Sequence, residues 1–290
     1  MKVVRAGILG FCMGVRRAVE MARRESGKTG CRVYTFGPLI HNPSVLDDLK
    51  ERGIKVLEES EAFPKEPEYK NSTVIIRAHG VSPRTERELG RQGFHILDAT
   101  CPHVKVSQTK ARAFAERGYR IFLAGEKKHA EITGIRGYVE DNPCYVVGNP
   151  EEAEKAASEL FRSEPNAQTV LIGQTTISPG EYRAIGEQIR YFFPSLEILD
   201  TICGATADRQ GVLRELCSKV DALIIAGGRE SANTRRLLSL ALELGKPAWL
   251  VETAGDIPPE IGSYKTVGLS AGASTPDSLI AEIEETLKAM

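Results

Sequence analysis

Short runs of apolar residues alternate along the chain with segments whose apolar residues recur at helical spacing. Residues 73–77 and 222–226 are such runs and predict buried strands. Residues 15–26 carry apolar side chains at positions i, i+3, i+4 and i+7, which predicts a helix with one buried face. Because strands and helices follow one another at short spacing, the pattern predicts an α/β fold with mostly parallel sheets. Ligands of such sheets bind beyond the carboxyl ends of the strands.

Three cysteines stand at equivalent points of this pattern. Cys12, Cys101 and Cys203 each follow an apolar run and precede a helical segment. The last two lie in segments that echo each other, Leu97-Asp98-Ala99-Thr100-Cys101 and Leu199-Asp200-Thr201-Ile202-Cys203. We therefore predict that three strand ends, each carrying a thiolate, meet at one point. Cys12 lacks the echo and is close to the N-terminus, so we expect the first strand to join the sheet of the last third of the chain.

Length and charge narrow the classes of protein that fit. A chain of 290 residues suits two or three domains rather than one small core. The formal net charge of −1 provides no overall field that would favour nucleic acid or an anionic membrane surface. No apolar run approaches the ~20 residues that span a bilayer, and the first residues lack the pattern of a signal peptide. We expect a bacterial cytoplasmic protein with neither a nucleic acid nor a membrane as its partner.

The remaining cysteines limit the kinds of metal site. In the cytoplasm the six cysteines are expected to be thiols, and none forms the Cys-x-x-Cys pair of zinc ribbons. Cys31, Cys144 and Cys217 are interpreted as packing residues. The other three precede helices, whose N-termini lower a thiol pKa, and three thiolates suit either zinc or an iron–sulfur cluster. A cluster held by only three cysteines leaves one iron open as a Lewis acid.

Several loops at predicted strand ends carry polar side chains. His41, His79 and His129 lie in loops bounded by glycine or proline and suggest a cationic ring around an anion. Ser231 and Asn233 follow Gly227-Gly228 at the start of a helix, a setting that favours phosphate, although helix capping is the ordinary interpretation.

Two further positions are candidates for proton transfer. Glu131 is a candidate proton donor or, alternatively, an ordinary carboxylate in the first turn of a helix. Thr175 could relay a proton through its hydroxyl or simply end a strand. Near the C-terminus, Thr275 is expected to cap the last helix and Pro276 to begin it.

Longer motifs run through the chain in order. They are Gly10-Phe11-Cys12-Met13-Gly14-Val15, Gly37-Pro38-Leu39-Ile40-His41-Asn42, Arg77-Ala78-His79-Gly80, Asp98-Ala99-Thr100-Cys101-Pro102, Gly125-Glu126-Lys127-Lys128-His129-Ala130-Glu131, Gln174-Thr175-Thr176, Asp200-Thr201-Ile202-Cys203, Ser231-Ala232-Asn233-Thr234 and Ala271-Gly272-Ala273-Ser274-Thr275-Pro276. With these motifs the chain resembles the 4-hydroxy-3-methylbut-2-enyl diphosphate reductase family (IspH/LytB), which acts last in the non-mevalonate isoprenoid pathway.

The resemblance implies a fold and a cofactor. It implies three pseudo-equivalent α/β domains around a central cavity that contains the cluster. Their expected ranges are residues 14–100, residues 101–199, and residues 1–13 plus 200–290 with a C-terminal extension. It also implies a [4Fe–4S] cluster with three cysteine ligands, Cys12, Cys101 and Cys203, and one open iron.

The resemblance further implies the reaction and its residues. The substrate would be dehydroxylated reductively to isopentenyl diphosphate and dimethylallyl diphosphate, with electrons from ferredoxin or flavodoxin with its reductase. Glu131 and Thr175 would position water and deliver protons. The expected substrate-binding residues are His41, His79, His129, Thr175, Ser231, Ala232, Asn233 and Ser274. Ala232 departs from the serine of many members, but its backbone N–H can still donate a hydrogen bond.

Two alternatives use the same residues. A zinc hydrolase would need no reductant, and a phosphate-binding module without enzymatic activity would bind its ligand without the three cysteines. The absence of Cys-x-x-Cys and the repeated Asp-x-x-Cys make both less favoured than the reductase.

Overall fold

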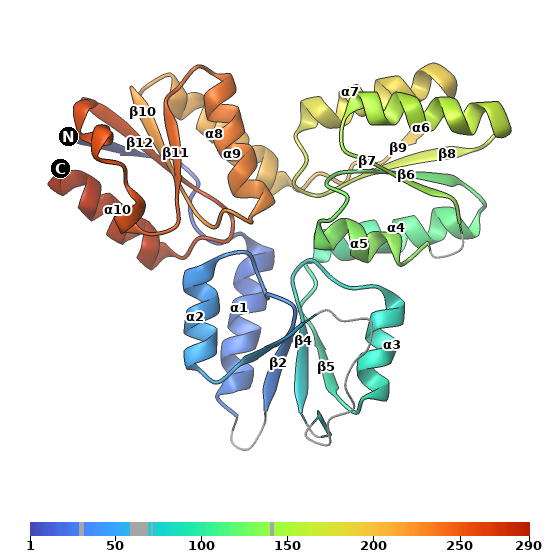
Figure 1. The fold of residues 1–290 in the computed structure, drawn as a ribbon, viewed down its shortest axis with the longest axis horizontal. Coiled ribbons are helices and arrows are strands. Elements are labelled where there is room, and N and C mark those ends of the chain that lie inside the picture. Colours follow the sequence, from blue (N-terminus) through green and yellow to red (C-terminus); the bar gives the residue numbers. More distant parts are fainter. Residues whose placement is uncertain (29–31, 59–68, 71, 140–141) are drawn as a thin grey trace. The chain divides into compact units, whose positions relative to one another are not determined.

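A computed structural model describes residues 1–28, 32–58, 69–70, 72–139 and 142–290 (Figure 1). The expected packing role of Cys31 therefore lies outside the described residues. Within them the chain forms three four-stranded sheets, and every strand pairing given by its register is parallel. The predicted α/β class with mostly parallel sheets is confirmed.

The first sheet is formed by the N-terminal part of the chain and has the order β3-β2-β4-β5. Its strands are β2 (Val33–Phe36), β3 (Lys55–Leu57), β4 (Thr73–Ile76) and β5 (His95–Asp98). Helix α3 (Pro83–Arg91) packs Leu89 against Tyr34 and Val74 of this sheet. The sequence pattern did not predict β3, because this edge strand has only three residues and two of them are exposed.

The second sheet has the order β7-β6-β8-β9 and is covered on both faces. Its strands are β6 (Arg120–Ala124), β7 (Cys144–Val147), β8 (Thr169–Gly173) and β9 (Glu197–Ile198). On one face Ile121 and Leu123 pack against α4 (Pro102–Glu116) and α5 (Ala130–Arg136). On the other, Phe122 packs against α6 (Pro150–Ser163) and α7 (Pro179–Phe192). The alternation along β6 is the two-residue period of a strand that is buried on both faces.

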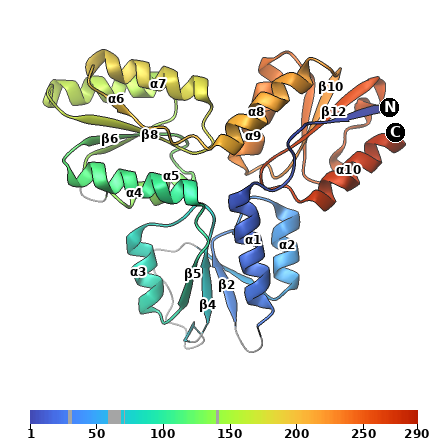
Figure 2. The ribbon, with the colours of Figure 1, turned by 180° about the vertical axis from the view of Figure 1, so that it is seen from behind.

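The third sheet joins both ends of the chain, with the order β1-β12-β10-β11 (Figure 2). Its strands are β1 (Lys2–Arg5), β10 (Ala222–Ala226), β11 (Ala248–Val251) and β12 (Thr266–Ala271). Helices α8 (Gly204–Cys217) and α9 (Ala232–Glu243) cover one face, and α10 (Asp277–Ala289) covers the other. Lys2 aligns with Thr266, which confirms the prediction that the first strand joins the sheet of the last third.

The chain divides into two compact units. The first consists of Met1–Gly30, Pro38–Val56 and Gly204–Met290, and the second of Cys31–Gly37 and Leu57–Cys203. The first unit contains α1 (Met13–Ser26) and α2 (Pro43–Glu51), joined by an ion pair of 2.8 Å between Arg23 and Asp48. It also contains two short 3₁₀ helices, η2 (Ala254–Asp256) and η3 (Pro259–Ser263). The three domain ranges expected above stay a prediction.

Two details of the sequence-based expectation need correction. Thr275 does not cap the last helix, because its hydroxyl donates to the Ala226 carbonyl at 2.9 Å inside the protein. Pro276 is the residue that precedes α10 and does not begin it. In addition, Glu131 lies in the first turn of α5, a helix of seven residues, as the alternative interpretation of this residue predicted.

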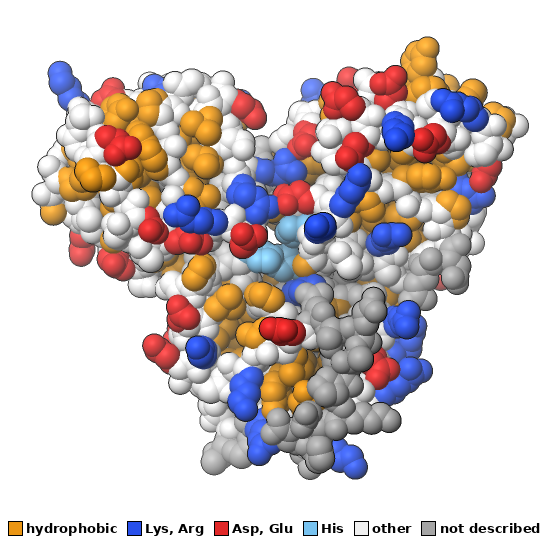
Figure 3. All heavy atoms as spheres, viewed as in Figure 1, with side chains coloured by type: hydrophobic (Ala, Val, Ile, Leu, Met, Phe, Trp, Pro, Cys, Tyr) orange, Lys and Arg blue, Asp and Glu red, His pale blue; other side chains and the backbone are white. Residues whose placement is uncertain are grey.

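Two of the other cysteines are shielded from solvent, and the surface carries charges of both signs. Cys217, the last residue of α8, is buried in the core. Cys144 is half-buried, and burial raises the pKa of its thiol to about 12. Lys, Arg, Asp and Glu side chains of both signs are intermixed over the face drawn in Figure 3. None of the helices in the described part of the chain combines the length and hydropathy needed to cross a bilayer.

Candidate active site

Two of the three candidate cysteine ligands lie in the second unit, each at the end of a strand and the start of a helix. Cys101 follows β5 and is the N-cap of α4, and its N–H donates to the Ala78 carbonyl at 2.9 Å. Cys203 follows β9 and directly precedes Gly204, the first residue of α8; its N–H donates to the Thr175 carbonyl at 2.9 Å. Both are half-buried. The positive end of a helix stabilises a thiolate, so both positions suit a metal ligand.

The two echoing loops are stabilised by different residues. In the first, the Asp98 carboxylate accepts hydrogen bonds of 2.9 Å from the Thr100 N–H and from Lys105. Burial opposes ionisation of Asp98, but these two partners outweigh it and hold the pKa of Asp98 below its usual value. In the second, the Thr201 hydroxyl accepts from the Gly173 N–H at 2.8 Å and donates to the Gly173 carbonyl at 3.0 Å. The repeated sequence therefore places two cysteines similarly but fixes their loops by different bonds.

Glu131 is buried on α5 and bound to Thr175 from 44 residues away. The Thr175 N–H donates to Oε1 at 2.6 Å, and the Thr175 hydroxyl donates to Oε2 at 2.8 Å. Burial raises the pKa of Glu131 to about 7, even though both hydrogen bonds act to lower it. A carboxyl group with this pKa both holds and releases a proton near neutral pH, as a general acid must.

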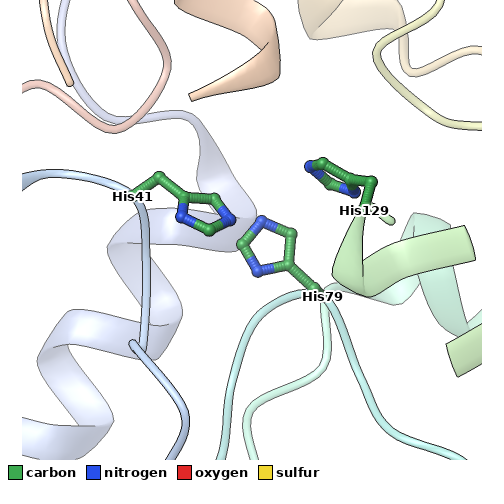
Figure 4. Close-up of side chains that lie close together, drawn as sticks. All are labelled: His41, His79 and His129. Atoms are coloured by element: carbon green, nitrogen blue, oxygen red, sulfur yellow. The ribbon is translucent and has the colours of Figure 1, made fainter. Parts of the chain in front are cut away.

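His79 and His129 meet edge to face in the same unit (Figure 4). Their ring centroids are 5.2 Å apart and the ring planes lie at 86°. His129 is the N-cap of α5, where its Nδ1 accepts from the Glu131 N–H at 3.2 Å. The neutral ring therefore carries its proton on Nε2, which can donate a hydrogen bond to a ligand.

A series of contacts connects the site residues of the second unit. Cys101 bonds the residue before His79, His79 packs on His129, and His129 bonds Glu131. Glu131 bonds Thr175, and the Thr175 carbonyl accepts from Cys203. This unit therefore brings together six of the predicted site residues: His79, Cys101, His129, Glu131, Thr175 and Cys203.

Gln174, for which the sequence predicts no role, supports the same site. Gln174 is fully buried at the end of β8. Its Oε1 accepts from the Glu126 N–H at 2.9 Å, and its Nε2 donates to the Thr176 hydroxyl at 2.9 Å. These bonds fix the turn that leads to His129. The available signal was a polar residue directly after a strand that is otherwise fully buried.

The first unit brings together another group of predicted residues around the turns that follow β10 and β12. Cys12 is the N-cap of α1, and its N–H donates to the Ala273 carbonyl at 3.0 Å. The next residue, Ser274, donates from its hydroxyl to the His41 carbonyl at 3.1 Å. A Cβ at Gly228 would lie 2.5 Å from that same carbonyl oxygen, so only glycine permits this close approach.

Helix α9 supplies the remaining candidates. Ser231 is its N-cap, and the Ser231 hydroxyl accepts from the Thr234 N–H at 3.4 Å, which confirms the capping interpretation. Ala232 is the first helical residue and is buried. Asn233 is 5% exposed, and within the described part of the chain neither its Oδ1 nor its Nδ2 has a hydrogen-bond partner. A buried amide without partners costs about 1–3 kcal/mol, so this side chain suits a polar ligand at the helix N-terminus.

Each of the three cysteines thus lies at the start of a helix, as predicted. That all three meet at one point stays a prediction. The roles assigned to these residues by the resemblance stay predictions as well.

Comparisons with known proteins place this geometry in context. A family model described as LytB protein matches residues 3–288. A Treponema denticola protein named 4-hydroxy-3-methylbut-2-enyl diphosphate reductase is 46% identical over 99% of both chains. A protein of the same name from Aquifex aeolicus is 36% identical, over 96% of this chain and 93% of the relative.

The chain is also similar to solved structures of reductases. The E-1-hydroxy-2-methyl-but-2-enyl-4-diphosphate reductase from Plasmodium falciparum superposes with a TM-score of 0.89 at 26% identity, over 98% of this chain and 87% of that one. A structure of (E)-4-hydroxy-3-methyl-but-2-enyl diphosphate reductase, described as the terminal enzyme of the non-mevalonate pathway, superposes with a TM-score of 0.70. It is 34% identical, and each chain covers the other completely.

Proposed function

The chain belongs to the LytB protein family, and we propose that it is an oxidoreductase of the non-mevalonate isoprenoid pathway. It reduces 4-hydroxy-3-methylbut-2-enyl diphosphate to isopentenyl diphosphate and dimethylallyl diphosphate. Two electrons and two protons enter, the C–O bond of the allylic hydroxyl breaks, and one water leaves. The observation that carries the proposal is the buried Glu131–Thr175 pair, whose Thr175 carbonyl accepts from the Cys203 N–H.

The family implies an iron–sulfur cluster, and the donor set of this chain fits one. Cys12, Cys101 and Cys203 are half-buried thiols at helix starts, and soft thiolate ligands select iron–sulfur clusters or zinc. We propose that these three hold a [4Fe–4S] cluster with one iron open. When bound, the cluster supplies a Lewis acid for the hydroxyl oxygen and passes electrons one at a time.

Glu131 is the proposed source of protons. Its pKa of about 7 leaves a large fraction protonated at neutral pH, in contrast to an exposed glutamate. The proton is held on the carboxyl group beside the Thr175 hydroxyl, which can accept it and pass on its own. The two hydrogen bonds from Thr175 also fix the orientation of the carboxyl group, which keeps it ready for transfer.

The proposed binding groups for the diphosphate are side chains and backbone N–H groups. Asn233 supplies a buried amide that has no hydrogen-bond partner among the described residues. The first N–H groups of α9, including that of Ala232, supply donors at a positive helix end. His129 offers Nε2–H, since its Nδ1 already accepts from the chain. The other proposed binding groups are His41, His79, Thr175, Ser231 and Ser274.

The electrons must come from another protein, because nothing in the substrate supplies them. We propose a one-electron carrier, ferredoxin or flavodoxin with its reductase. The expectation of a bacterial cytoplasmic protein remains a prediction.

Anaerobic preparation with iron and sulfide tests the proposal. We expect brown protein with about four irons per chain and a visible spectrum that changes on addition of the diphosphate substrate. Reduced donor should then convert the substrate to the two products. Colourless, zinc-loaded protein that hydrolyses substrates without a reductant would instead indicate a zinc hydrolase. Tight substrate binding after all three cysteines are changed to serine, without any turnover, would indicate a binding module.

A further inference from the structure

Arg209 is a buried arginine that none of the site motifs includes. It lies on α8, the helix that begins directly after Cys203, and it is 4% exposed. Its Nη1 donates to the Ala205 carbonyl at 3.1 Å, one turn earlier in the same helix. Its Nη2 donates to the Gly10 carbonyl at 2.7 Å. The side chain therefore joins α8 to a residue 199 positions earlier in the chain, only two residues before Cys12.

The segment from Gly10 to Cys12 is bonded to other parts of the chain at both of its ends. Gly10 has φ +75°, and a Cβ at this position would overlap the Asp277 carboxylate. Cys12 donates its N–H to Ala273, and its side chain makes no capping hydrogen bond to α1. Arg209 thus fixes the carbonyl at one end of the segment, and Ala273 fixes the amide at the other. Between these two bonds the peptide planes that orient the Cys12 thiol have little freedom.

The chemistry of the bond suits this task. A hydrogen bond from a charged donor to a carbonyl is among the stronger ones in proteins, and burial strengthens it further. The guanidinium group is planar and donates in two fixed directions at once, whereas a lysine ammonium can replace the charge but not this geometry. The orientation of the Arg209 side chain also depends on the preceding turn of α8, because Nη1 donates to the Ala205 carbonyl there.

From these contacts we propose that Arg209 is a positioning residue for the metal centre: it holds the Cys12 segment against the helix that follows Cys203. The proposal rests on the proposed function for the identity of the centre. The predicted consequence is that loss of the Arg209 fork loosens Cys12 first, so that the cluster is lost from this ligand.

The test compares Arg209→Gln and Arg209→Lys with Arg214→Gln as control. Arg214 lies on the same helix but is exposed. In metal-free protein, hydrogen exchange at Phe11, Cys12 and Met13 should be about ten-fold faster in Arg209→Gln than in the wild type. The lysine variant should fall between them, and the Arg214 control should match the wild type. Exchange in the second unit should stay unchanged in all variants.

In anaerobically loaded protein, a chelator should remove iron from Arg209→Gln several-fold faster than from the wild type or the control. The electron paramagnetic resonance spectrum of the reduced variant should also differ from that of the wild type, which a general loss of stability would not produce. Wild-type exchange and wild-type iron loss in Arg209→Gln would overturn the inference. If Arg209→Gln does not fold, wild-type exchange and wild-type iron loss in Arg209→Lys would overturn the inference instead.

The two proposals fail in distinguishable ways. A wild-type protein that takes up no iron–sulfur cluster overturns the proposed function. The exchange measurement needs no cluster, so it still decides whether Arg209 holds the Cys12 segment.

Discussion

Glu131 is a carboxyl group that is enclosed by protein and still titrates near neutral pH. Two effects oppose each other here: removal from water favours the neutral acid, and the two bonds from Thr175 favour the carboxylate. Burial is the stronger, so the pKa of Glu131 rises to about 7.

The first prediction concerns pH and turnover. The protonated form of Glu131 is the proposed donor, so the rate of turnover should fall as pH rises through about 7. Glu131→Gln should keep the cluster and substrate binding, since the amide has nearly the same shape, but should lose at least about a hundred-fold in turnover. Steady-state kinetics between pH 6 and 9 with a chemical reductant measures both effects. Near-normal turnover of Glu131→Gln would remove Glu131 from the mechanism.

Stability gives an independent check of the same group. Because the folded-state pKa of Glu131 lies above the ordinary value of 4.5, the folded protein holds this proton more tightly than the unfolded chain. The contribution to the free energy of unfolding is therefore complete below about pH 4.5 and is lost as pH rises through about 7. Denaturant unfolding of metal-free protein should show this decline in the wild type and a smaller one in Glu131→Gln. An identical decline in both proteins would contradict the assigned pKa.

Short elements carry the candidate chemistry, and they are the elements that the sequence pattern describes least well. A longer helix is close to its predicted range: α1 covers Met13–Ser26, where the pattern predicted a helix over residues 15–26. By contrast, α5 has seven residues and follows a run of charged residues, so it is too short for apolar residues at helical spacing to predict its range. The cap expected at Thr275 failed for a related reason: local sequence favoured a cap, but the buried Ala226 carbonyl offered the hydroxyl a tertiary partner.

The loop before Cys203 provides a prediction at this scale. Thr201→Val keeps the shape of the side chain but removes both hydrogen bonds to Gly173 and leaves two buried backbone groups without this partner. We expect a loss of about 1–3 kcal/mol in the free energy of unfolding. Thr109→Val is the matched control, because the Thr109 hydroxyl bonds Lys105 on an exposed helix face. Denaturant unfolding of the wild type and both variants measures the free energy of unfolding. Equal stability of the two variants would contradict the role of Thr201.

The sequence indicated which residues lie at strand ends, because that depends on local pattern, but it did not indicate most of the long-range bonds between them. Thr175 and Glu131 are 44 residues apart, and Arg209 and Gly10 are 199 apart. No periodicity encodes such pairs. Joining of the first strand to the last sheet was predictable only because Cys12 stood apart from the repeat.

A prediction for the whole chain concerns β1. Lys2 donates its N–H to Lys265 and Ala6 donates to Leu269, so by alternation the N–H of Val4 faces β12 and that of Val3 faces away. Val4→Pro should therefore lower the free energy of unfolding by about 1–3 kcal/mol more than Val3→Pro, which serves as control. Thermal and denaturant unfolding of metal-free protein measure the difference. Equal effects of the two prolines would contradict the register of β1.

The pairing of β1 with β12 also affects the order of events during synthesis. A ribosome produces Lys2–Arg5 first and reaches Thr266–Ala271 only after about 260 further residues. At ~5–20 residues per second this takes roughly 13 to 50 seconds, during which β1 has no strand to pair with. The Cys12 segment follows β1, and the Cys12 N–H can bond Ala273 only after this late part of the chain has been made. Cys12, a proposed ligand of the cluster, is therefore predicted to reach its final position only at the end of translation.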